Sequence, residues 1–193
     1  MKRLILASTS RYRRSLMDRL GVPYEAVAHR VDEDAYKWDG QDPEALARTL
    51  SEAKAASLRE LFPDAYILGS DQVAIVGSEI LSKPVTVAAA EAQLRRLRGG
   101  THSLITGLAL DCPDAQVWAE ADRTTLKMRA LTDGEIARYI AADEPLDCCG
   151  SYRIESRGIA LFESIDCPDY TAIVGLGLLR VCSLLRRAGF NVP

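Results

Sequence analysis

Short apolar runs alternate with segments of helical spacing in the first half of the chain. The runs 4–7 and 65–68 predict buried strands, and the loosely alternating stretch 24–31 predicts another. The apolar stripe over 43–62 predicts a long amphipathic helix that begins with a proline. We expect a loop over 38–42 before this helix. Strands that alternate with helices favour an α/β fold with a mixed sheet.

The second half is richer in strand patterns. The predicted elements are a hairpin over 73–81, a helix over 86–97, long strands over 101–110 and 117–128, a helix that begins at Thr132, a strand over 158–162 and a final helix over 174–188. We find no internal repeat, low-complexity segment or linker that would divide the chain.

Composition narrows the function classes. Of the 193 residues, 48% are hydrophobic and 26% charged, which is typical of a soluble globular protein. The net charge of −3 argues against a nucleic-acid partner. No apolar run approaches the ~20 residues of a membrane span, and the N-terminus does not resemble a signal peptide. Five cysteines without a C-x-x-C pair fit neither a disulfide framework nor a zinc site, so we expect a reducing cytoplasm.

One stretch near the N-terminus combines a strand, a turn and a helix. Three hydroxyl residues, 8–10, follow the first strand and precede Arg11, Arg13 and Arg14, and apolar residues at helical spacing follow over 15–20. Free N–H groups at a helix N-terminus favour an anion, and hydroxyl and guanidinium donors strengthen that preference. The stretch indicates a phosphate cradle. The alternative is a Ser-capped helix with a solvated basic face.

Polar clusters follow three of the predicted strands, at residues 8–10, 32–34 and 70–72. Ligands of α/β sheets gather at the carboxyl ends of strands. Lys54 lies within a predicted helix, and Lys83 lies in a tight turn. Carboxylates that hold a hard cation, together with separated Lys and Arg residues, suit a nucleoside triphosphate with Mg²⁺. Taken singly, each of these residues could also be an ordinary solvated surface group.

We predict no functional role for the two histidines or for the pair of glycines near the C-terminus. His29 and His102 are isolated, and their neighbours indicate neither a metal site nor a catalytic triad. Gly175 and Gly177 lack the third glycine of a dinucleotide fingerprint and are interpreted as a helix entry.

A set of motifs runs through nearly the whole chain. The motifs are L-A-S-T-S-x-x-R (6–13), V-D-E (31–33), E-A-K (52–54), G-S-D-Q-V (69–73), K-P (83–84), T-G-L-A-L (106–110) and G-S-Y (150–152). In this order they resemble the Maf family of nucleoside triphosphate pyrophosphatases. The resemblance implies an α/β fold with an elongated mixed β-sheet flanked by helices, similar to inosine triphosphatases. It also implies a single Maf-like domain over 1–193, alternatively with two lobes and the active site in the cleft between them.

The resemblance further implies a reaction and the residues that carry it. A nucleoside triphosphate would be hydrolysed to its monophosphate and pyrophosphate with a divalent cation, Mg²⁺ or Mn²⁺. Asp71 would be the general base and a metal ligand, Glu33 the second ligand and Lys83 a further catalytic residue. The residues expected to bind the phosphates are Ser8, Ser10, Arg13 and Lys54.

Three positions resemble the branch of the family that acts on 7-methyl-GTP. Tyr12 stands where that branch has an aromatic residue, and Gln72 and Glu155 stand where the dTTP/UTP branch has Thr and Gln. An aromatic face can stack on the cationic base of 7-methylguanine. The carboxylate of Glu155 can accept from the N1–H and N2–H₂ edge of guanine.

The sequence departs from the family pattern at three places. Arg11 replaces a proline, Ser82 replaces a glycine, and Ser156-Arg157 replaces the Gly-x pair after Glu155. The last departure borders the expected base pocket. The alternatives are a dTTP/UTP pyrophosphatase of the same family and a non-catalytic nucleotide-binding regulator of septum formation. A homodimer is the default assembly.

Overall fold

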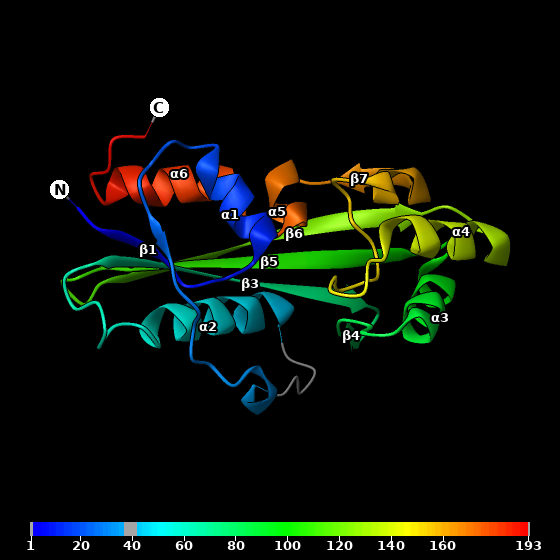
Figure 1. Cartoon of the computed structure of the whole chain (residues 1–193), viewed down its shortest axis with the longest axis horizontal. Helices are drawn as coiled ribbons and strands as arrows, with labels where there is room; N and C mark the ends of the chain where they lie inside the picture. The colour runs from blue at the N-terminus through cyan, green and yellow to red at the C-terminus, as the bar shows by residue number, and fades with distance from the viewer. Residues whose placement is uncertain (1, 37–41, 193) are drawn as a thin grey trace. The chain divides into compact units, whose positions relative to one another are not determined.

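The computed structural model describes residues 2–36 and 42–192, and its elements follow the predicted α/β order (Figure 1). The strands are β1 (Leu4–Leu6), β2 (Glu25–Ala26), β3 (Tyr66–Val76), β4 (Glu79–Leu81), β5 (Thr101–Asp111), β6 (Val117–Met128) and β7 (Phe162–Asp166). The α-helices are α1 (Arg11–Asp18), α2 (Pro43–Ala56), α3 (Val87–Leu97), α4 (Asp133–Asp143), α5 (Tyr170–Val174) and α6 (Leu178–Arg187). Two 3₁₀ helices, η1 (Glu33–Ala35) and η2 (Arg157–Leu161), complete the described elements.

The strands form a mixed sheet in the order β2-β1-β3-β5-β6-β7, with β4 paired to β3. Strand β1 is parallel to β2 and β3, whereas β4 and β7 are antiparallel to β3 and β6. The chain divides into two compact units. Unit 1 comprises Met1–Gln72, Thr106–Asp122 and Asp169–Pro193, and unit 2 comprises Val73–Ile105 and Arg123–Pro168.

Helices cover both faces of the strands in unit 1 (Figure 1). Leu4 and Leu6 of β1 pack in a buried cluster with apolar residues of α1 and α6. Ile5 and Ala7 point to the opposite face and pack with Ala55 of α2. The alternation along β1 therefore separates two cores. None of the helices in the described ranges is long and apolar enough to cross a membrane.

Two glycines allow α2 to lie directly on the strands of unit 1. A Cβ atom at Gly69 in β3 would overlap the carbonyl oxygen of Ser51, and one at Gly107 in β5 would overlap that of Ala47. Only glycine tolerates such an approach of two backbones. The contact brings Lys54, one turn beyond Ser51, over β3.

Strand β3 differs from the prediction. The prediction ends a strand at residue 68 and places the polar cluster 70–72 after it, but β3 continues to Val76. Ser70 and Asp71 are therefore buried inside a strand. Buried polar groups persist where partners satisfy them, and both side chains have partners in unit 1.

Other boundaries also differ from the predictions. The predicted strand over 24–31 is reduced to β2, and the predicted helix over 43–62 ends at Ala56. The predicted strand over 158–162 is wrong, because 157–161 form η2 and β7 begins at Phe162. The predicted last helix over 174–188 begins late, because Gly175 has a φ of 121° that no helix accommodates. Most of the predicted loop over 38–42 lies outside the described residues.

In unit 2, α3 packs against α4. Thr132 and Glu135 form the predicted capping box at the start of α4. An aromatic cluster includes buried His102, whose Nε2 lies 2.8 Å from the hydroxyl of Tyr152. Burial lowers the pKa of His102 to about 4, so its imidazole is neutral near pH 7.

Candidate active site

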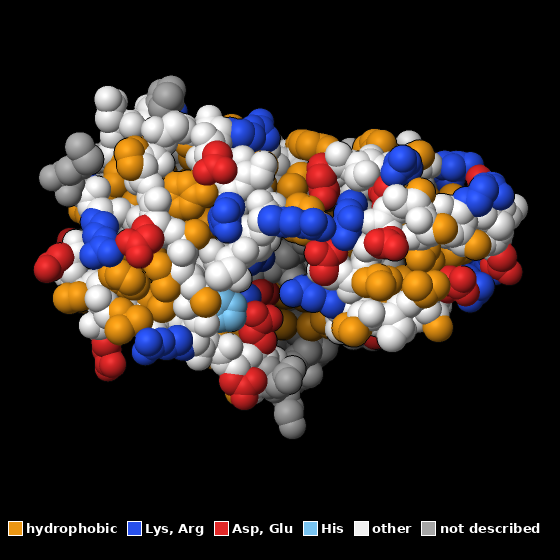
Figure 2. Space-filling model, in the orientation of Figure 1, with side chains coloured by type: hydrophobic (Ala, Val, Ile, Leu, Met, Phe, Trp, Pro, Cys, Tyr) orange, Lys and Arg blue, Asp and Glu red, His pale blue; other side chains and the backbone are white. Residues whose placement is uncertain are grey.

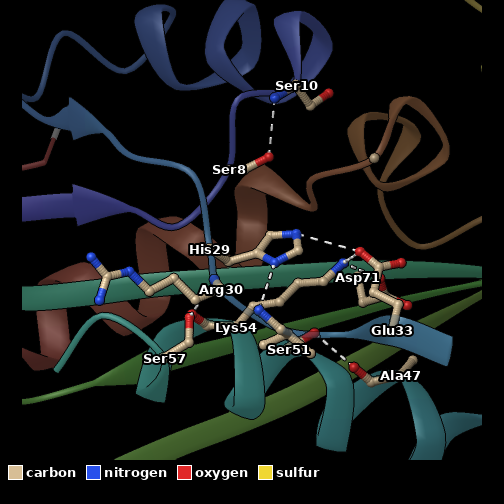
Figure 3. Close-up of polar contacts among 12 residues, drawn as sticks. Ser8, Ser10, His29, Arg30, Glu33, Ala47, Ser51, Lys54, Ser57 and Asp71 are labelled. Atoms are coloured by element: carbon tan, nitrogen blue, oxygen red, sulfur yellow. Dashed lines mark hydrogen bonds and ion pairs between the residues drawn. The ribbon is translucent and has the colours of Figure 1, made fainter. Parts of the chain in front are cut away.

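A buried lysine connects two of the predicted catalytic carboxylates (Figure 3). The ammonium of Lys54, on α2, lies 2.6 Å from Oδ1 of Asp71 on β3 and 2.8 Å from Oε1 of Glu33 on η1. The Lys54 side chain is 3% exposed and that of Asp71 is 9% exposed, whereas that of Glu33 is 49% exposed. One ammonium is thus shared by a buried and a half-exposed carboxylate. The structure brings together three residues that are far apart in the sequence.

His29 adds a contact that the sequence analysis missed. Its Nε2 lies 3.4 Å from Oε1 of Glu33, and its Nδ1 accepts a hydrogen bond from the backbone N–H of Val31. This acceptor role assigns the ring proton to Nε2, which then faces Glu33. Burial lowers the pKa of His29, and the charge of Lys54 lowers it further. The i,i+4 spacing from Glu33 carried no signal, because the segment between them is not a helix.

The predicted phosphate-binding residues Ser8, Ser10 and Arg13 also lie together in unit 1. The backbone N–H of Ser10 donates to Oγ of Ser8 at 3.2 Å, and Nη1 of Arg13 lies 3.5 Å from the same oxygen. The Arg13 Nε donates to the carbonyl of Gly175, which also accepts from Ser70. In the described part of the chain the Ser10 hydroxyl caps no N–H group of α1. The Ser-capped alternative therefore lacks its capping hydrogen bond, and phosphate binding stays a prediction.

The side-chain amide nitrogen of Gln72 donates hydrogen bonds within unit 1. Its Nε2 lies 3.1 Å from Oγ1 of Thr106, and 2.9 and 3.0 Å from the carbonyl oxygens of Ala172 and Ile173 at the end of α5. A role in base selection would therefore use the carbonyl oxygen of Gln72 or act through α5.

Tyr12 is partly exposed on α1, beside Arg11. The Arg11 guanidinium lies 4.7 Å from the centre of the Tyr12 ring, and its Nη2 donates to the Tyr12 hydroxyl at 2.7 Å. The arginine that replaces the family's proline therefore covers one face of the aromatic ring. A stacking base would use the other face or displace the guanidinium.

The two remaining predicted residues belong to unit 2. Lys83 is exposed after β4, and Glu155 is exposed in a turn that precedes η2. The structure thus gathers eight of the ten predicted site residues in unit 1. The roles of all ten stay predictions.

Glu33 and Asp71 provide a donor set that suits a hard cation. Magnesium is commonly held by one or two carboxylates, with substrate phosphates and water completing its octahedron. Among the described residues no group of three or more His, Cys, Asp or Glu could hold a metal ion. Glu33 and Asp71 thus offer the one or two carboxylates that Mg²⁺ commonly takes from a protein.

Surface charge is mixed. Figure 2 shows basic and acidic side chains interspersed on the visible face, with no single basic field. This distribution agrees with the net charge of −3.

Comparison with known proteins identifies the family. A family model described as "Maf-like protein" matches residues 3–188, and the chain belongs to this family. It is 46% identical over 193 residues to a protein of Xanthomonas axonopodis pv. citri named 7-methyl-GTP pyrophosphatase, with 100% of both chains covered. It is 41% identical to a protein of the same name from Chromohalobacter salexigens, with 99% of this chain and 98% of that protein covered.

A solved structure supports the fold class. The Staphylococcus aureus Ham1 protein aligns with a TM-score of 0.50 and 14% identity, over 97% of this chain and 100% of that one. At this identity the likeness concerns the fold alone. The predicted class, a mixed sheet flanked by helices, is confirmed.

Proposed function

We propose that this protein hydrolyses 7-methyl-GTP to 7-methyl-GMP and pyrophosphate, an activity that would clear modified nucleotides. The observation that carries the proposal is the buried ammonium of Lys54, shared by Asp71 and Glu33. Full-length relatives that are 46% and 41% identical and are named 7-methyl-GTP pyrophosphatase support the choice of substrate.

Asp71 would act as the general base. It would accept a proton from the water whose oxygen bonds to the α-phosphorus, while the bond from that phosphorus to the bridging oxygen breaks and pyrophosphate leaves. The positive charges of Lys54, Arg13 and Lys83 would neutralise the triphosphate and the leaving group. Mg²⁺ or Mn²⁺ held by Asp71 and Glu33 would supply Lewis-acid stabilisation of the phosphate oxygens. Ser8 and Ser10 would contribute further donors to the phosphates.

Base selection would rest on Tyr12, Gln72 and Glu155. The methylated guanine carries a delocalised positive charge, which favours an aromatic face and a carboxylate partner. Uracil and thymine present an N–H flanked by carbonyl oxygens, which a carboxylate would meet unfavourably. We expect kcat/KM for 7-methyl-GTP to exceed that for GTP, dTTP and UTP.

A nucleotide panel tests the proposal. Purified protein with Mg²⁺ or Mn²⁺ is incubated with 7-methyl-GTP, GTP, dTTP and UTP, and chromatography separates nucleoside monophosphate and pyrophosphate from diphosphate and phosphate. A preference for dTTP or UTP would favour the other branch of the family, and no turnover on any nucleotide would favour a regulator. Release of diphosphate and phosphate would refute attack at the α-phosphorus. Gel filtration of the same sample tests the expected homodimer.

A further inference from the structure

The turn that carries Glu155 is anchored to the end of α4 on both of its sides. Before Glu155, the guanidinium of Arg153 donates to the carbonyl oxygens of Asp143 and Glu144 at 2.6 and 3.0 Å. After it, the Ser156 hydroxyl donates to Oδ1 of Asp143 at 3.1 Å. The Arg157 backbone N–H donates to Oδ2 and its Nη1 to Oδ1, both at 3.0 Å. All of these groups lie in unit 2.

Backbone hydrogen bonds within the turn also hold it together. The backbone N–H groups of Ser156 and Gly158 both donate to the carbonyl oxygen of Arg153, at 3.2 and 3.0 Å. A Cβ atom at Gly158 would overlap that same oxygen, so the turn requires glycine there. Glu155 is therefore an exposed side chain in the middle of a tight turn, and whatever fixes the turn also fixes where this side chain leaves the backbone.

The position of Asp143 needs these donors. Its side chain is only 1% exposed and lies at the last residue of α4, where the helix dipole disfavours a negative charge. A buried carboxylate is costly unless it is hydrogen-bonded. Ser156 and Arg157 supply three donors, and the 67% exposed Arg157 side chain supplies the opposite charge. The helix end and the turn consequently hold each other in place.

We propose that Asp143 is a positioning residue for base selection, which acts by fixing the turn that presents Glu155. The inference rests on the proposed function. The two side-chain donors to Asp143 come from Ser156 and Arg157, and a glycine at 156 could not supply the first. Ser156 and Arg157 thus connect the turn of Glu155 to the end of α4.

The first test is Asp143→Asn, which keeps the shape and turns one acceptor into a donor that faces N–H groups. We expect the ratio of kcat/KM for 7-methyl-GTP to that for UTP to fall about tenfold, mainly through KM for 7-methyl-GTP. Turnover of UTP should stay within about twofold. The control is Asp133→Asn, the same change at the other end of α4, where the carboxylate pairs with Arg95 and Arg98. It should leave the ratio unchanged.

The second test places Asp143→Asn in a Glu155→Gln background. If Asp143 acts through Glu155, the change should no longer alter the substrate ratio, since interacting positions are non-additive. A merely structural role would lower activity on every substrate and would do so equally in both backgrounds. If Asp143→Asn does not fold, Ser156→Ala with Arg157→Ala removes two donors from the other side of the contact and should shift the ratio in the same direction.

The outcomes separate the two proposals. Wild-type protein that fails to hydrolyse 7-methyl-GTP would overturn the proposed function and this inference with it. Wild-type protein that prefers 7-methyl-GTP while Asp143→Asn keeps the same ratio would overturn the inference alone. An equal shift of the ratio in the Glu155→Gln background would also overturn it.

Discussion

Replacing Lys54 with methionine should destabilise the protein more than replacing Asp71 with asparagine, although both changes break the same ion pair. Lys54→Met leaves the buried carboxylate of Asp71 without its cation. Asp71→Asn leaves the ammonium paired with Glu33 at 2.8 Å, and the amide oxygen can still accept from it. The two variants therefore compare a buried carboxylate that has lost its cation with an ammonium that keeps one carboxylate partner and one hydrogen bond.

The expected losses in the free energy of unfolding follow from the burial of Lys54 and Asp71. Removing one partner of a buried ion pair costs about 3–5 kcal/mol, because the other charge stays uncompensated. Weakening one charged hydrogen bond costs at most about 1.5–3 kcal/mol. In a protein of this length, 1 kcal/mol corresponds to a shift in Tm of roughly 2–4 °C. The double variant should be more stable than Lys54→Met alone, because it buries no unpaired charge.

Urea denaturation of the three variants measures these differences. The matched control is Lys127→Met, which removes an exposed lysine paired with Glu163 at 2.6 Å and should cost less than about 1 kcal/mol. The reasoning fails if Lys54→Met is no less stable than Asp71→Asn. It also fails if the double variant is no more stable than Lys54→Met.

Three further outcomes are expected. Asp71→Asn should lower kcat by roughly 10²–10⁴-fold while Asp64→Asn, an exposed control, keeps the wild-type rate; more than about a tenth of wild-type turnover in Asp71→Asn would exclude it as the base. Glu155→Gln should lower kcat/KM for 7-methyl-GTP about ten- to a hundredfold while activity on UTP and dTTP holds or rises, and equal losses on all substrates would place Glu155 in catalysis. Because burial lowers the pKa of His102 to about 4, the unfolded state binds a proton first as the pH falls below about 6.5. The free energy of unfolding should therefore drop by up to about 3 kcal/mol between pH 6.5 and pH 4, and a pH dependence unchanged in His102→Gln would contradict this.

Local signals in the sequence were sufficient where neighbours in the chain decide the structure. The capping box at Thr132 and the hairpin of β3 and β4 are of this kind. The polar residues Ser70 and Asp71 were interpreted as the end of a strand, but they lie inside β3. Their partners, Lys54 and Gly175, come from distant segments of the chain, which no local sequence pattern reveals. The residues around Ser8 indicated a phosphate cradle, which stays a prediction, and the grouping of Lys54 with Asp71 and Glu33 was expected from the family motifs. The structure brings these three side chains together and adds the contact of His29 with Glu33.

The glycines at 69 and 107 link mutational tolerance to chemistry. Neither glycine has a side chain to offer a nucleotide, yet a single methyl group at either would collide with the backbone of α2. The helix would have to lift or slide, and Lys54 would move away from Asp71 with it. Under the proposed function, selection for the reaction would therefore extend to these two positions. A library of substitutions would record a packing constraint at both positions, and the same constraint sets the distance between the ammonium of Lys54 and the carboxylate of Asp71.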